Sequence, residues 1–231
     1  MTIHRRFVGR TALAAAATLA LSVAAFPAAA DGPDNSARSG AWWQWALSIP
    51  AAVNPMLDAT GQNCMVGQSG KTWFLAGTFN GGTATRRCSI PPGVRLFFPV
   101  ANSVQIDSPG VCAQEGSVSI ADLRAFAAAF IDGITTYAVT LDSRPVRSVR
   151  RVRSDVFAVA IPAANVFNTV GCETTSVPVP AAVFTRSIDD GYYAEIEDLS
   201  AGTHTLHITA SGPKLDLNVV YQLDVAPRGN R

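Results

Sequence analysis

The chain has 231 residues, with 18 basic and 17 acidic side chains and a formal net charge of +1. A chain so close to neutral has no overall field that would attract nucleic acid or an anionic membrane, so we expect neither as a partner. The length that remains after an N-terminal leader suits one sizeable all-β domain, residues 31–231.

Residues 1–30 have the pattern of an export signal, with a basic start, an apolar stretch over residues 11–26 and a small-residue cleavage site. The residues concerned are Arg5, Arg6 and Arg10, then Ala28, Ala29 and Ala30. The stretch is short for a bilayer span and no basic stop-transfer residues follow it. We therefore expect cleavage near Asp31, no transmembrane anchor afterwards, and a secreted or periplasmic protein. The pair Arg5-Arg6 leaves twin-arginine export open beside the general secretory route.

The first elements of the mature chain are expected to be a helix and a hairpin. Residues 31–39 are polar and predict a flexible lead, whereas residues 40–49 repeat apolar side chains at helical spacing. Residues 72–77 and 83–90 are strand-like. They flank Asn80-Gly81-Gly82, whose residues tolerate positive φ, so the pattern predicts a hairpin.

A third strand over residues 94–100 should complete a meander. Ser119 and Asp122 resemble a capping box at the start of a second helix, near residues 121–131, and Gly133 ends it. Further strands are expected at 135–141, 146–161, 192–197, 204–210 and 214–225. Roughly ten strands and only two helices predict an all-β fold, an antiparallel β-sandwich of jelly-roll or immunoglobulin-like type.

Four cysteines lie in the mature part, and an even number in an exported protein indicates two disulfides. Three pairings are possible, of which we favour Cys64 with Cys88 and Cys112 with Cys172. Each bond should stabilise the fold by roughly 3 to 4 kcal/mol. The spacings do not match a zinc or redox site, so we expect no metal there.

Several segments together resemble a family of uncharacterised, signal-bearing secreted bacterial proteins. They are residues 43–50 (WQWALSIP), 73–79 (WFLAGTF), 88–93 (CSIPPG), 96–99 (LFFP), 191–193 (GYY) and 199–206 (LSAGTHTL). The resemblance covers most of the mature chain. It implies a secreted β-sandwich and supplies no catalytic residues.

Tryptophans form the first candidate site. Trp42, Trp43 and Trp45, with Trp73 further on, could provide flat indole faces on which sugar rings stack. The alternative is that they pack the first helix against the sandwich, with Trp43 the most exposed of the three.

Two histidines remain after the leader, His204 and His207. Strand alternation places His204 on the buried face, where a bond to a nearby carbonyl or acid is expected, and His207 on the opposite face. If this strand pairs with residues 192–197, then Glu195, Glu197 and His207 could form an acid and base group of a hydrolase or lyase. The alternative is a solvated sheet face.

A dense basic run forms the third candidate: Arg144, Arg147, Arg150, Arg151 and Arg153. Such a run could dock an acidic glycan through bidentate contacts. The alternative is an edge strand that its charges protect from pairing with another sheet.

The sequence contains no nucleophile elbow, zinc-protease motif, phosphate loop or dinucleotide fingerprint. We therefore expect no cofactor and favour a non-enzymatic role. The interpretation that fits best is non-catalytic binding of a cell-envelope or environmental ligand, with carbohydrate preferred because of the tryptophans. A hydrolase or lyase and a structural envelope component are the alternatives.

Overall fold

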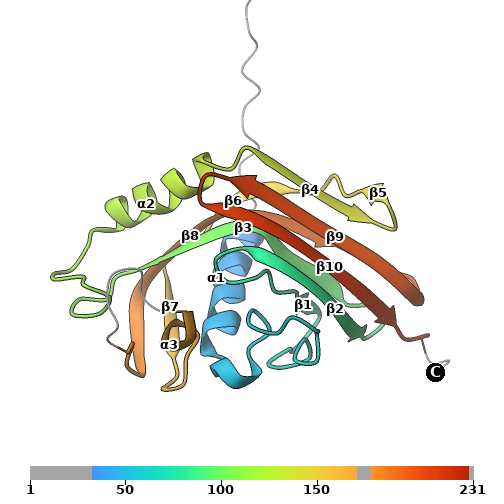
Figure 1. Cartoon of the computed structure of the whole chain (residues 1–231), viewed down its shortest axis with the longest axis horizontal. Coiled ribbons are helices and arrows are strands. Elements are labelled where there is room, and N and C mark those ends of the chain that lie inside the picture. Colours follow the sequence, from blue (N-terminus) through green and yellow to red (C-terminus); the bar gives the residue numbers. More distant parts are fainter. Residues whose placement is uncertain (1–32, 171–177, 229–231) are drawn as a thin grey trace, which may run out of the picture. The chain divides into compact units, whose positions relative to one another are not determined.

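The structure is a computed structural model that describes residues 33–170 and 178–228 (Figure 1). Within these ranges the helices are α1 (Pro33–Ser48), the 3-10 helix η1 (Ala51–Val53), α2 (Ile120–Asp132) and α3 (Phe167–Val170). The strands are β1 (Thr72–Phe74), β2 (Gly82–Ile90), β3 (Arg95–Ile106), β4 (Thr136–Leu141), β5 (Arg144–Pro145), β6 (Arg150–Arg153), β7 (Phe157–Ile161), β8 (Ala182–Ile196), β9 (Gly202–Gly212) and β10 (Leu215–Val225).

The strands form two five-stranded sheets. Sheet A has the order β1-β3-β8-β6, with β7 also paired to β8, and sheet B has the order β2-β10-β9-β4-β5. Each sheet contains one parallel pair, β1 with β3 and β2 with β10. The other pairs are antiparallel. The prediction of a β-rich fold is confirmed, but both sheets are mixed where purely antiparallel sheets were expected.

The predicted hairpin and meander are wrong, because β1 lies in sheet A and β2 in sheet B. The turn between them does have the expected backbone, with φ of 63° at Asn80, 86° at Gly81 and 97° at Gly82. It carries the chain across to the second sheet. There β2 pairs with β10 from Gly82 to Ile90, and this long ladder outweighs a short local hairpin.

The main core lies between the two sheets. Sheet B contributes alternate residues of β10, from Leu217 through Tyr221 to Val225, which are buried while Asp216, Asn218 and Gln222 are exposed. Sheet A contributes Leu96, Phe98 and Val100 of β3, among others. The strand expected over residues 214–225 is therefore confirmed, and its burial follows the two-residue period of a strand with one buried face.

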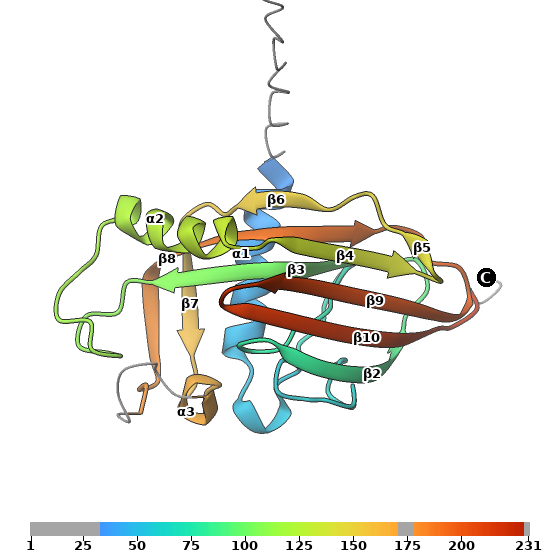
Figure 2. The ribbon, with the colours of Figure 1, turned by 45° about the horizontal axis from the view of Figure 1, so that its top comes forward.

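Helices cover sheet A on both faces (Figures 1 and 2). On the face away from sheet B, α1 packs against β7, β6 and β8 and forms a second apolar cluster. Helix α1 begins at Pro33, so most of the lead that was expected to be flexible is helical. Proline suits the first turn of a helix, where its missing N–H costs nothing.

Helix α2 lies beside sheet B, over β8 and the second half of β3. Leu123, Ala127 and Ile131 are its buried side chains. Its predicted cap is confirmed, because Ser119 Oγ accepts a hydrogen bond from the Asp122 N–H at 3.1 Å.

Candidate functional site

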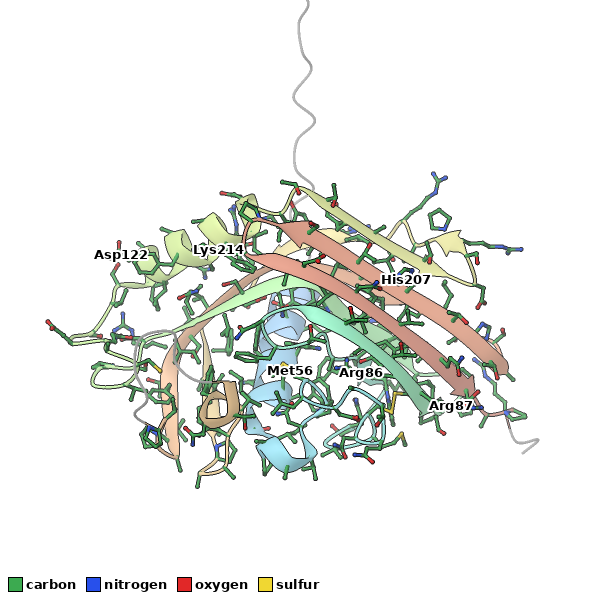
Figure 3. The ribbon with its side chains drawn as sticks, viewed as in Figure 1. Met56, Arg86, Arg87, Asp122, His207 and Lys214 are labelled. Carbon is green, nitrogen blue, oxygen red and sulfur yellow. A yellow bond between two sulfur atoms is a disulfide. The ribbon has the colours of Figure 1, made fainter. Side chains whose placement is uncertain are left out.

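A groove of about 750 Å³ lies between α2, the second half of β3 and the start of β10. We call it the α2–β3 groove. It is lined by residues 77–80 and 99–105 and by Trp42, Trp43, Met56, Phe126, Ala129, Phe130, Phe167, Lys214, Leu215 and Leu217. Figure 3 labels two of the lining residues, Lys214 in the β9–β10 turn and Met56 in the loop after η1.

The walls of the groove are mainly apolar. Phe126 and Phe130 stand one turn apart on α2, and Phe126 is 56% exposed, which is unusual for so large an apolar side chain. On the opposite side Phe79 and Phe167 pack edge to face, with ring centroids 5.7 Å apart. Among the lining residues Lys214 is the only ionisable one.

The floor of the groove is the edge of β3. Seven consecutive residues, 99–105, line it. Side chains of a strand alternate between its faces, so a continuous run can line one groove only where the strand presents its edge. Burial agrees, because residues 102–106 are all partly exposed and show no alternation.

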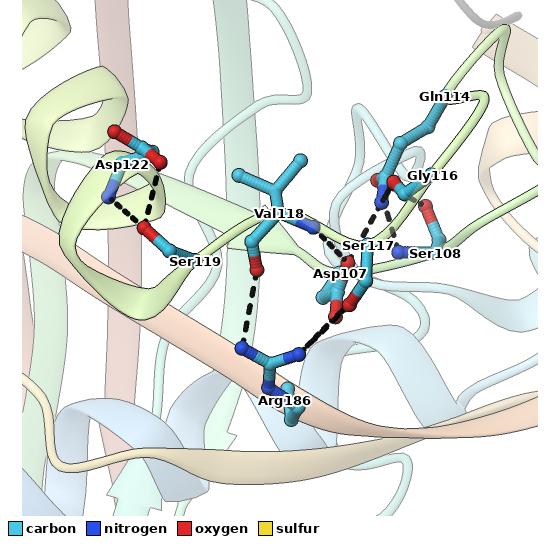
Figure 4. Close-up of polar contacts among 9 residues, drawn as sticks. All are labelled: Asp107, Ser108, Gln114, Gly116, Ser117, Val118, Ser119, Asp122 and Arg186. Atoms are coloured by element: carbon cyan, nitrogen blue, oxygen red, sulfur yellow. Dashed lines mark hydrogen bonds and ion pairs between the residues drawn. The ribbon is translucent and has the colours of Figure 1, made fainter.

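A polar network holds the segment that leads from β3 to α2 (Figure 4). The buried carboxylate of Asp107 accepts hydrogen bonds from Ser117 Oγ, from the Val118 N–H at 2.8 Å and from Gln114 Nε2 at 2.7 Å. Arg186 Nη1 lies 2.7 Å from the same carboxylate. The bond from Ser117, then that from Val118, hold the pKa of Asp107 below its ordinary value. The network therefore fixes the α2 wall to sheet A.

A fully buried carboxyl group, Asp189, supports the groove from behind. Trp43 Nε1 donates to Asp189 Oδ1 at 2.7 Å, and the Tyr193 hydroxyl donates to Oδ2 at 2.9 Å. Asn102 Nδ2 donates in turn to the Tyr193 hydroxyl at 2.9 Å. Burial raises the pKa of Asp189 to about 7, although the bonds from Trp43 and Tyr193 oppose the rise. Because Asp189 has no exposed surface, it positions Trp43 and Asn102 and does not meet a ligand itself.

The predicted tryptophans are all buried, with exposures of 1% for Trp42, 6% for Trp43, 7% for Trp45 and 7% for Trp73. The indole N–H of Trp42 bonds to Leu75 O at 3.0 Å, and that of Trp45 to Val66 O at 2.9 Å. This geometry supports the packing alternative. Trp43, which was expected to face solvent, donates its N–H to Asp189 instead, and Trp42 and Trp43 line the groove as buried side chains.

The predicted acid and base group does not assemble. Its condition was that the strand of Glu195 pairs with the strand of His207, but β8 belongs to sheet A and β9 to sheet B. Glu195 forms ion pairs with Arg38 and Arg95, and Glu197 with Arg95. His207 Nε2 lies 2.8 Å from Asn218 Oδ1.

The expectation for His204 is confirmed. Its Nδ1 lies 2.7 Å from Asp142 Oδ2, and its Nε2 lies 3.0 Å from Ser200 O. The hydrogen bond to Asp142 raises the pKa of His204.

The basic run lies on sheet edges, since β6 is the last strand of sheet A and β5 the last of sheet B. Arg151 and Arg153 contact Asp190, Arg151 through both Nε and Nη2. A second cavity, of about 360 Å³, is lined by Arg150, Arg38, Arg95, Glu195 and Tyr193, among others. Glu195 pairs with Arg38 and Arg95, and Glu197 pairs with Arg95, so two carboxylates face three arginines and the cavity keeps a net positive charge.

The Cys64–Cys88 disulfide is present, as predicted. Cys172 lies outside the described residues, so its pairing with Cys112 stays a prediction. In the part of the chain that the structure describes, no group of three or more His, Cys, Asp or Glu side chains could hold a metal ion. Nor does any described helix combine the length and the apolar character that a membrane span requires.

The groove is not apparent from the amino-acid sequence. In the sequence, a single apolar face at helical spacing is formed by Leu123, Phe126, Ala127, Phe130 and Ile131. In the structure the buried side chains of α2 follow every fourth position from Leu123, whereas Phe126 and Phe130 form the neighbouring ridge. The available signal was the width of this apolar face, which is greater than a single helix–sheet contact needs. Comparison with family models, with curated proteins and with solved structures finds no match.

Proposed function

We propose that the protein is a non-catalytic binding protein whose ligand occupies the α2–β3 groove. The observation behind this proposal is a groove of about 750 Å³ with exposed phenylalanine rings on its walls and a strand edge on its floor. Ligand sites are usually concave and mostly apolar, with a few polar groups that set orientation. The groove has that composition, since Asn80, Asn102 and Gln105 lie among its aromatic residues.

Binding is preferred over catalysis because of where the ionisable groups lie. General acid and base chemistry needs titratable groups within hydrogen-bond reach of the reacting atoms. Lys214 is the single ionisable residue that lines the groove, and Asp189 behind it is sealed from solvent.

Export of the protein is part of the same proposal. The leader-like residues 1–30 and the Cys64–Cys88 disulfide support an oxidising compartment outside the cytoplasm. The two packed sheets also support the proposal that the domain is a sandwich of jelly-roll or immunoglobulin-like type.

The binding site can be tested by filling the groove. Ala129 lines it from the exposed side of α2, whereas Ala125 is exposed on the same helix and does not line it. We would screen peptides, soluble glycans and fatty acids by calorimetry against the wild type, Ala129→Trp and Ala125→Trp. At least one class should bind the wild type and Ala125→Trp, and should bind Ala129→Trp at least about tenfold more weakly. Binding by none of the classes, or equal binding by both variants, would refute the proposal and favour a structural envelope component.

A further inference from the structure

The edge of β3 that faces the groove has backbone groups that no described residue pairs with. In an antiparallel ladder the N–H and C=O of one residue point to the same neighbour, and successive residues alternate. The Asp107 N–H donates to Arg186 O, toward β8, at 2.9 Å. Residues 101, 103 and 105 therefore also point toward β8, and Asn102, Val104 and Ile106 point away from it.

A bulge explains why this edge is open only in its second half. The register of β3 with β8 shifts between Pro99 and Ala101. Before the bulge, β1 occupies the outer edge as far as Phe97, whose C=O accepts from the Leu75 N–H at 3.2 Å. Pro99 has no N–H to offer. Beyond it, no strand of the described residues pairs with this edge, and no hydrogen bond joins the backbone of Asn102, Val104 or Ile106 to a described residue on that side.

A strand added here would be covered on both faces. The side chains of Val104 and Ile106 pack against the cluster that surrounds α1. Phe126 and Phe130 of α2 lie on the opposite face, toward sheet B. Strands that are covered on both faces are apolar along their whole length. The groove therefore suits an extended peptide with few charged side chains.

One end of the groove is closed and carries the positive charge. Sheet B begins there with Leu215 and Leu217, and residues 77–80 lie at the same end. Lys214 stands in the turn beside the last residues of α2, whereas Asp122 marks the far end of that helix (Figure 3). A peptide that runs from the far end toward sheet B brings its C-terminus to Lys214. A C-terminal carboxylate complements a lysine at such a position.

We propose that the α2–β3 groove binds the C-terminal segment of another polypeptide, which adds a strand antiparallel to β3 and places its carboxylate at Lys214. This inference rests on the proposed function and specifies its ligand. Backbone bonds to Asn102, Val104 and Ile106 supply the affinity, and the phenylalanine walls select apolar side chains.

The experiment uses protein purified after expression of the full chain and a library of random hexapeptides with free C-terminal carboxylates. Selected peptides should be rich in apolar residues. Conversion of the carboxylate to an amide should weaken binding by about fivefold. Lys214→Gln should remove that difference, and Lys71→Gln should keep it, because Lys71 is exposed and lies outside the groove.

Methylation of the peptide nitrogens, one at a time, tests for the added strand. Every second methyl group should weaken binding by about tenfold, and those between should have little effect. Equal effects at all positions would overturn strand addition, and equal binding of acid and amide would overturn the role of Lys214.

If glycans or fatty acids bind to the wild type, bind more weakly to Ala129→Trp, and no peptide binds, this inference fails and the proposed function stands. If no probe binds, both fail. Association of the protein with itself through this edge, seen by sedimentation, would also refute a heterologous partner.

Discussion

Asp189 should make the protein less stable as the pH rises toward neutrality. Its pKa is about 7 in the folded protein, against an ordinary value of 3.8. The folded state therefore binds this proton more tightly than the unfolded chain does. The contribution of Asp189 to stability is fully present below pH 3.8 and is lost as the pH rises through about 7.

The size of the effect follows from the difference between the two pKa values. With about 1.4 kcal/mol for each pKa unit, the full effect is about 4 kcal/mol, of which about 3 kcal/mol develops between roughly pH 5 and pH 8. Asp189→Asn removes the ionisation and keeps an oxygen that can accept from Trp43 Nε1. The variant should resemble the wild type at the acidic end and exceed its stability at the alkaline end.

The pH dependence of the free energy of unfolding can be measured by urea unfolding at several pH values across this window, followed by tryptophan fluorescence. His204 also has a raised pKa, so its stabilisation is lost in a similar range. His204→Gln is therefore the control, and it should retain most of the slope. Parallel pH profiles for the wild type and Asp189→Asn would show that the buried carboxyl group does not titrate in this window.

Three further variants test the packing and the site. Arg86 is 2% exposed and donates to the carbonyl oxygens of residues 58, 76 and 77, so Arg86→Met should lower the free energy of unfolding by about 3 kcal/mol in urea titrations. The control Arg87→Met replaces an exposed neighbour and should barely move the urea midpoint. Equal effects of the two substitutions would contradict the structural role given to Arg86. Replacing Cys64 and Cys88 together by alanine should cost about 3 kcal/mol for the loop they close, and an unchanged melting temperature would contradict this. Asp107→Ala should speed amide hydrogen exchange in α2 at least about tenfold and leave β9 unaffected, whereas uniform acceleration would indicate global destabilisation.

The alternation of single strands and the cap of α2 could be predicted because each depends on neighbours in sequence. The buried face of β10 and the Ser119 cap both follow from local periodicity. Sheet membership could not be predicted in the same way. β1 and β2 were expected to pair across the Asn80-Gly81-Gly82 turn, but the choice between sheets depends on β10, more than a hundred residues away.

Local sequence patterns also could not predict which side chains from distant elements would become partners. Trp43 looked suited to solvent because its neighbours on α1 already formed an apolar face. Its place was decided by Asp189, on a strand whose contact with α1 no local pattern shows. Glu195 and His207 looked like partners because their strands are consecutive, and consecutive strands often pair. Here β8 and β9 are in different sheets, so the candidate acid and base group is divided between them.

The bulge at the middle of β3 has a consequence for how this strand can change during evolution. The extra residue reverses which positions face α1, so deletion of a single residue there would turn Asn102, Val104 and Ile106 toward the opposite layer while leaving Leu96 and Phe98 in place. The first half is constrained by the sandwich core, and the second by the cluster around α1 and by the bond from Asn102 to Tyr193, so both depend on the length of the strand.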